Sequence, residues 1–121
     1  MATSSSSAST SEPAHWLVRG DVVLASAEVA GTRRRRARGL LGRDGIDGVL
    51  VLDGVRSVHT FGMRFPIDVA YCDSEGVVLR IVTMCRRRVS GPVWAARRVL
   101  EAESGAFAKW GVVAGDRLEL R

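Results

Sequence analysis

The sequence has few of the residues that usually build metal sites and disulfide frameworks. Its 121 residues include two cysteines, Cys72 and Cys85, and two histidines, His15 and His59. Their spacing matches no zinc motif, and on the hairpin predicted below the two cysteines lie too far apart to be bridged. We therefore expect two reduced thiols in the core, and neither a metal nor any other cofactor.

Long apolar runs are also absent. Nowhere does the chain run for about 18 apolar residues, and its start shows neither a positively charged segment nor an apolar stretch of signal-peptide length. This pattern predicts no membrane segment and a cytoplasmic protein. Residues 1–12 hold six serines and two threonines, so we expect a disordered tail there and a single domain over residues 13–121.

Lysine is nearly missing, because 17 of the 18 cationic residues are arginine. The net charge of +5 allows anionic partners. Codon usage in a GC-rich genome also favours arginine over lysine, without any selection for phosphate contacts. The runs Arg33–Arg36 and Arg86–Arg88 are of the kind that contacts phosphates. No aromatic residue is interleaved with them in the sequence, and no nucleic-acid fold signature is present. A basic nucleic-acid-associated protein is therefore an alternative function rather than the favoured one.

Short apolar segments separated by turn residues predict a mainly-β fold. Strands are expected within residues 16–29 and 67–84 and at residues 49–52, 55–59, 99–102 and 117–120. A short helix is expected over residues 33–41 after the N-cap Thr32, and another over residues 104–110. About seven short strands with two short helices, and no regular alternation of strand and helix, favour a small β-sandwich or a partly closed barrel.

The clearest predicted element is a hairpin over residues 67–84. Its turn, at residues 73–76, fits a three-residue loop whose glycine takes a positive φ. In this register Asp68 lies diagonal to Arg80, where an ion pair across the strands would give Asp68 a purely structural role. One mostly apolar face is then shared by Ile67, Val69, Tyr71, Leu79, Ile81 and Thr83.

Three segments taken together resemble a known family. They are residues 38–43 (Arg-Gly-Leu-Leu-Gly-Arg), residues 59–69, and Val99-Leu100-Glu101 followed by Gly105 and Gly115-Asp116. In this order and spacing the chain is similar, over residues 16–120, to the domain of unknown function 192 family, also named uncharacterised protein family 0127. The resemblance implies a compact β-sandwich-like domain with two short helices, and it implies no established activity, substrate or cofactor.

The chain departs from the family pattern in two respects. Where relatives often read Trp-Met-Lys-Asn-Thr, residues 59–64 read His-Thr-Phe-Gly-Met-Arg, so no role of that Trp or Asn carries over. Many relatives carry an export signal or a membrane anchor before the domain, which this sequence does not show.

The segment from His59 to Asp68 concentrates groups that bind anions. Arg64 offers a planar fork suited to a carboxylate or phosphate, and His59 donates to the same anion when protonated. We expect His59, Arg64 and Asp68 to lie at one rim and to bind a small anionic ligand or a protein partner. The candidate ligand-binding residues are His59, Thr60, Arg64, Asp68 and Glu101.

Purely structural roles and enzymatic roles are the alternatives for these residues. Asp68 could accept backbone N–H groups from residues 61–63, and Glu101 could hold the start of the helix near Ser104. In an enzyme, a hydrolase for example, His59 would act as a general base oriented by Asp68 or Glu101. The sequence marks no activated nucleophile, so a non-enzymatic binding module is the favoured hypothesis.

Overall fold

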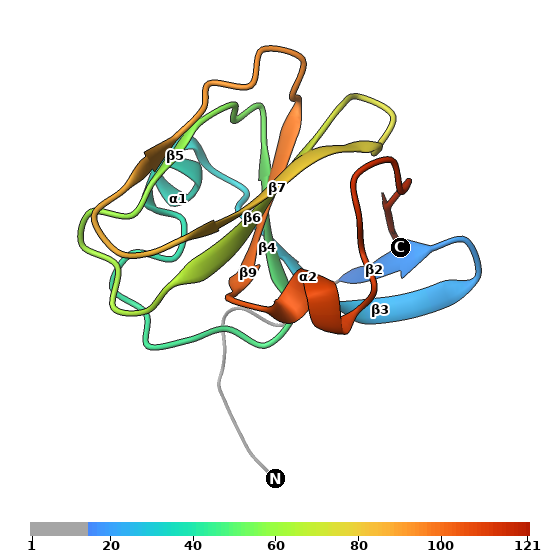
Figure 1. Cartoon of the computed structure of the whole chain (residues 1–121), viewed down its shortest axis with the longest axis horizontal. Coiled ribbons are helices and arrows are strands. Elements are labelled where there is room, and N and C mark those ends of the chain that lie inside the picture. Colours follow the sequence, from blue (N-terminus) through green and yellow to red (C-terminus); the bar gives the residue numbers. More distant parts are fainter. Residues whose placement is uncertain (1–14) are drawn as a thin grey trace, which may run out of the picture.

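A computed structural model describes residues 15–121 as one curled β-sheet, a small second sheet and two short helices (Figure 1). The predicted tail, residues 1–12, lies outside the described residues. The strands are β2 (His15–Arg19), β3 (Val22–Val29), β4 (Val49–Asp53), β5 (Val58–His59), β6 (Ile67–Cys72), β7 (Val78–Met84), β8 (Val89–Ser90), β9 (Arg98–Glu103) and β10 (Glu119–Leu120). The helices are α1 (Arg33–Arg38) and α2 (Ala106–Lys109). The predicted mainly-β fold with two short helices is confirmed.

The large sheet has seven strands in the order β10-β2-β3-β4-β9-β6-β7, and all neighbours are antiparallel except β3 and β4. Its two edges approach each other near the chain's end. The segment before β10 bonds to the start of β7, with 2.8 Å from the Val78 amide to the Asp116 carbonyl and 2.9 Å from the Leu118 amide to the Gly76 carbonyl. The sheet is therefore a partly closed barrel, since pairing its outer edges removes exposed strand groups.

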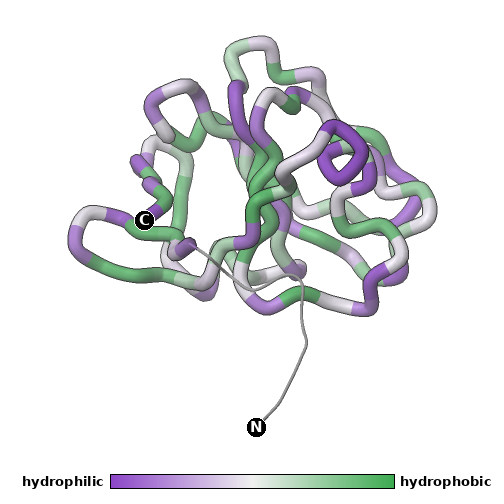
Figure 2. Tube along the Cα trace, turned by 180° about the vertical axis from the view of Figure 1, so that it is seen from behind, coloured by the Kyte–Doolittle hydropathy of each residue, from purple (hydrophilic) through white to green (hydrophobic). Residues whose placement is uncertain are grey.

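The central strands are buried on both faces, which explains their nearly continuous apolar sequence. Val49 and Val51 of β4 point into one core, and Leu50 and Leu52 point into another. The first core fills the barrel under α2, and the second lies between the sheet and the segments that carry α1, β5 and β8. Figure 2 shows these central strands as hydrophobic and α1 as a hydrophilic coil.

The predicted hairpin of β6 and β7 is present, with one change of register. Cys72 lies opposite Val78 as predicted, but the pairing shifts between Tyr71 and Cys72, so Asp68 faces Thr83. This β-bulge inserts one extra residue and turns the rest of β7 over. The predicted apolar face is therefore wrong beyond the bulge.

Three other predicted elements differ in their limits. The strand predicted at residues 55–59 is only β5, and it pairs with β8 in a separate sheet because both sides of β4 are taken by β3 and β9. Helix α1 ends before Gly39 and not at Gly42, although Thr32 caps it as predicted by accepting from the Arg35 amide at 3.1 Å. Helix α2 begins after Gly105 rather than Ser104. Neither helix is long and apolar enough to cross a membrane.

Candidate functional site

A cavity of about 540 Å³ opens between α1, the turn that follows β4, and β9. Its apolar part comes from the second core, and its polar part comes from α1, β5 and β9. The lining residues that carry charge or can carry it are Arg33, Arg36, Arg38, Asp53, His59 and Glu101. The site therefore combines an arginine-rich wall with one deeply placed carboxyl group.

Glu101 occupies a position in the sheet where an apolar residue is normal. Its cross-strand neighbours are Leu50 on β4 and Val69 on β6, and both are fully buried. The Glu101 residue is itself only 4% exposed, and its Oε1 atom has no hydrogen-bond partner. Burial raises the pKa of this carboxyl to about 7, while the Leu40 backbone and the Arg43 charge act in the opposite direction. Near neutral pH the carboxyl is therefore partly protonated, so it donates a hydrogen bond when neutral and only accepts when ionised.

Gly39, directly after α1, allows the backbone to pass over this carboxyl. It adopts φ 54° and ψ −130°, a conformation that side chains disfavour. A Cβ atom at this position would lie 2.9 Å from the Glu101 Oε1 atom and 3.4 Å from Oε2. The glycine therefore sets the close packing of the end of α1 against Glu101.

His59 ends β5 and lines the same cavity. Its side chain is exposed, and its ring lies 5.9 Å from the Phe61 ring between centroids. No hydrogen bond joins His59 to Glu101 or to Asp68 among the described residues, so the histidine–carboxylate pair expected for a hydrolase is not formed.

Thr60 is fully buried and ties two loops together. Its hydroxyl donates to the Cys85 carbonyl at 2.7 Å and accepts from the Arg88 amide at 2.8 Å. Both partners of the Thr60 hydroxyl are backbone atoms of the protein itself. Thr60 therefore holds the loop that carries His59 and does not face the cavity.

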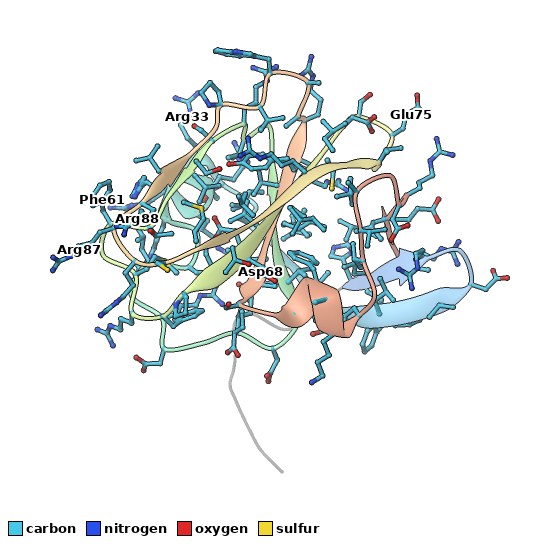
Figure 3. The ribbon with its side chains drawn as sticks, in the orientation of Figure 1. Arg33, Phe61, Asp68, Glu75, Arg87 and Arg88 are labelled. Atoms are coloured by element: carbon cyan, nitrogen blue, oxygen red, sulfur yellow. The ribbon has the colours of Figure 1, made fainter. Side chains whose placement is uncertain are left out.

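Arg64 and Asp68 lie apart from the cavity and from each other. Arg64 forms an exposed ion pair with Asp44 at 2.9 Å. Asp68 lies on β6 (Figure 3) and is buried. It accepts from the Thr83 hydroxyl at 2.7 Å and from the Gly105 amide at 3.0 Å. Within residues 15–121, no hydrogen bond or ion pair links Arg64, Asp68 and His59, so the predicted three-residue rim is not assembled.

The structural roles expected for the two carboxylates are also corrected. Asp68 contacts neither Arg80 nor the amides of residues 61–63, because the bulge turns Arg80 onto the Tyr71 face. The carboxylate that holds the start of α2 is Asp68 and not Glu101. Both are adjacent to α2 in sequence or space, and only the tertiary structure decides which one reaches it.

A second hollow, of about 710 Å³, lies around the β6–β7 turn and the last strand. Most of the charged groups in and beside it are paired within the chain. Arg98 pairs with Asp53, Arg117 with Glu75, and Arg121 with Glu119. The first cavity differs, because none of its three arginines forms an ion pair with another described residue.

The cavity also contains residues that were not predicted to form a small-ligand site. Arg33, Arg36 and Gly39 belong to the arginine run and to the Arg-Gly-Leu-Leu segment. The signal that could have found them is the joint occurrence of that segment with Val99-Leu100-Glu101, which the fold brings together. In the part of the chain that the structure describes, no cluster of three His, Cys, Asp or Glu side chains suited to a metal occurs.

The chain matches the DUF192 family, described as Uncharacterized ACR, COG1430, over residues 16–120. The match runs from the second residue of β2 to the end of β10 and includes both walls of the cavity. This chain belongs to the DUF192 family. The resemblance noted in the sequence is thus confirmed, and the family is one of unknown function. No match was found among curated proteins.

Two solved structures share the fold of this DUF192 domain. A protein of unknown function from Novosphingobium aromaticivorans DSM 12444 has a TM-score of 0.73 and 17% identity, covering 87% of this chain and 82% of that one. A candidate transcription regulator from Sinorhizobium meliloti 1021 has a TM-score of 0.72 and 24% identity, covering 87% of this chain and 90% of that one. At these identities the comparisons show the fold alone.

Proposed function

We propose that this domain is a small-ligand-binding module and that its site is the cavity above Glu101. The observation that carries the proposal is the Glu101 carboxyl, which is almost fully buried and keeps one oxygen without a partner. A buried polar atom left in this way costs about 1–3 kcal/mol, and a ligand that hydrogen-bonds to it recovers that energy. His59 and Glu101 are the two of the five candidate residues that we retain as ligand contacts.

The charges around the cavity favour a ligand with two different ends. Arg33, Arg36 and Arg38 line the wall without ion partners among the described residues, so they suit a carboxylate or phosphate. Glu101 suits an ammonium or another N–H donor elsewhere on the same ligand. We therefore propose a small zwitterion, which keeps the anionic ligand class expected from the sequence but moves its site from Arg64 to α1.

Arg36 and Arg34 provide a matched test of this site, since both lie on α1 and only Arg36 lines the cavity. The probes are a panel of amino carboxylates and amino phosphates, with acetate and inorganic phosphate as anions that lack the donor. A zwitterion that binds should raise the melting temperature of the wild type. Arg36→Gln should remove this rise, and Arg34→Gln should leave it.

The pH dependence provides an independent check of Glu101. Since an ammonium prefers the ionised carboxyl, affinity for the zwitterion should increase as the pH rises through about 7, and Glu101→Gln should lose this increase. Stabilisation that persists unchanged in both Arg36→Gln and Glu101→Gln would place binding elsewhere on the chain and contradict the proposal.

An enzyme is the second candidate function, and one observation favours it. A carboxyl group with a pKa of about 7 is suited to general acid–base catalysis at neutral pH. The measurement that separates the two functions is mass spectrometry of any zwitterion found to bind. Recovery of the unchanged compound after long incubation supports the binding module, and conversion that Glu101→Gln abolishes supports the enzyme.

A further inference from the structure

Two loops that are separate in sequence form one edge of the molecule. Strand β5 pairs with β8, so that His59 lies opposite Val89. The Thr60 amide donates to the Arg88 carbonyl at 2.8 Å, and the Arg87 amide donates to the Thr60 carbonyl at 3.2 Å. Together with the buried Thr60 hydroxyl, these bonds hold the Phe61 loop against the arginine run.

The result is an exposed aromatic side chain among exposed arginines. We call the set formed by Phe61, Arg86, Arg87 and Arg88 the Phe61 edge. Phe61 remains 53% exposed, and all three arginines are exposed. Figure 3 shows Phe61, Arg87 and Arg88 close together on the side of the molecule opposite Glu75. The aromatic residue that the sequence does not interleave with this arginine run is thus supplied by the fold.

The charge of the edge is not compensated locally. The sequence contains no Asp or Glu from residue 76 to residue 100, and among the described residues none of the three arginines forms an ion pair. Arg88 directs its Nη1 atom to the carbonyls of Arg86 and Arg87, at 3.5 and 3.2 Å. Arg87 has a φ of 62°, a left-handed conformation that is uncommon outside glycine and costs energy. The loop therefore has a defined conformation, and it presents positive charge at the surface.

We propose that the Phe61 edge binds single-stranded nucleic acid. Proteins that bind single strands combine a positively charged track for the phosphates with aromatic rings on which bases stack. Here Arg86 to Arg88 would contact successive phosphates, and the exposed Phe61 ring would stack with a base. A duplex is disfavoured, because α1 has six residues and α2 has four, and neither can act as a recognition helix in a major groove.

The phosphate contacts are tested by fluorescence anisotropy with a labelled oligothymidine of about 15 nucleotides, long enough for one such site. The double variant Arg86→Gln/Arg88→Gln is compared with Arg117→Gln/Arg121→Gln, which removes the same charge next to Glu75 and Glu119. The first should lower affinity at least tenfold and reduce the slope of log affinity against log salt by about 1.4. The second should change affinity less than about twofold.

Base stacking is tested on Phe61 with Trp16 as control, because Trp16 is similarly exposed, at 51%, and lies on β2. Phe61→Ala should weaken binding of oligothymidine at least about fivefold, as expected for losing one stacked base. It should have no effect on an abasic oligomer of the same length. Phe61→Trp should retain binding, and Trp16→Ala should bind like the wild type.

Several outcomes would overturn the proposal. One is absence of binding at low salt by a protein with a normal melting temperature, and another is an equal loss of affinity in the two arginine pairs. Preference for a duplex, or equal effects of Phe61→Ala on oligothymidine and abasic oligomer, would remove the single-strand assignment. Binding to phosphatidylglycerol vesicles but not to oligothymidine would assign the edge to a membrane surface. Glu101→Gln should not alter oligonucleotide binding, so this proposal and the small-ligand site stand or fall separately.

Discussion

A carboxyl group on a central strand of a sheet that is buried on both faces destabilises the fold when it is ionised. Glu101 shows how the chain accommodates such a group. Its neighbours on β4 and β6 are apolar, so the charged form loses its water without gaining a full set of partners. Gly39 lets the backbone pack over it. A carboxyl group that is buried with one oxygen unpartnered is a better functional candidate than the exposed Arg64, which already pairs with Asp44.

Stability should therefore depend on pH through Glu101. Its folded pKa of about 7 lies above the ordinary value of 4.5, so between these values the folded state keeps a proton that the unfolded state releases. Stability should fall as the pH rises from about 4.5 through 7, and Glu101→Gln should lose this dependence. The free energies of unfolding of the two proteins should diverge by on the order of 3 kcal/mol across the window.

Urea unfolding at a series of pH values measures this difference. The two proteins share every other titrating group, so the change in their difference isolates Glu101. Parallel stability curves for wild type and Glu101→Gln between pH 4.5 and 8 would show that this carboxyl titrates normally.

At the scale of elements, the small sheet of β5 and β8 depends on one buried hydroxyl. Thr60 bonds to the Cys85 carbonyl and the Arg88 amide, and these bonds connect the end of β5 to the loop before β8. Such a short two-stranded sheet is marginal without tertiary support. Thr60 therefore decides whether the loops at the Phe61 edge behave as one unit.

Replacing Thr60 by valine should lower the free energy of unfolding by about 1–3 kcal/mol, because the Arg88 amide and the Cys85 carbonyl lose a buried partner. The Arg88 amide should also exchange its hydrogen faster with solvent. Thr60→Ser keeps the hydroxyl and serves as the control, and it should preserve the slow exchange. Equal exchange rates in both variants would mean that β5–β8 pairing alone holds the loop.

The hairpin of β6 and β7 illustrates the limit of sequence patterns at this scale. The turn residues and the pairing of Cys72 with Val78 were predictable, because loop length selects the register next to the turn. The bulge next to Cys72 was not, since residues 78–84 are mostly apolar on both faces and fit either register. The barrel decided the outcome, and with it the separation of Asp68 from Arg80.

Across the whole molecule, burial separates the two cysteines into different chemical environments. Cys72 lies in the barrel core, 1% exposed, and burial raises its pKa to about 12. Cys85 is exposed, and neither forms a disulfide. The expectation of two free thiols is confirmed, but the expectation that both lie in the core is wrong for Cys85.

Ellman's reagent should therefore titrate one thiol in the folded protein and two in denaturant, without any reductant. Cys85→Ser should leave no fast-reacting thiol in the native state, because Cys72 is shielded and stays protonated. Rapid reaction of both cysteines under native conditions would show that the barrel opens readily enough to expose Cys72.

The sequence by itself determined the class of fold, the family and the kinds of chemistry available. Apolar segments and turn residues are local signals, so they located most strands, both helices and the Asp73–Gly76 turn. The resemblance pointed to Arg-Gly-Leu-Leu and Val-Leu-Glu as parts of one pattern. His59 and Glu101 were predicted as candidates from their residue types alone, which the sequence shows directly.

Only the tertiary structure decided which of these groups meet. Contacts between β5 and β8, between Gly39 and Glu101, and between Asp68 and Gly105 join residues 30 to 62 positions apart. No local pattern encodes such contacts, because they follow from how the sheet curls and which core each face fills. The same curling buried Asp68 and left Arg64 on the surface. The approach of Gly39 to Glu101 and the placement of Phe61 beside the arginines carry the two proposed sites.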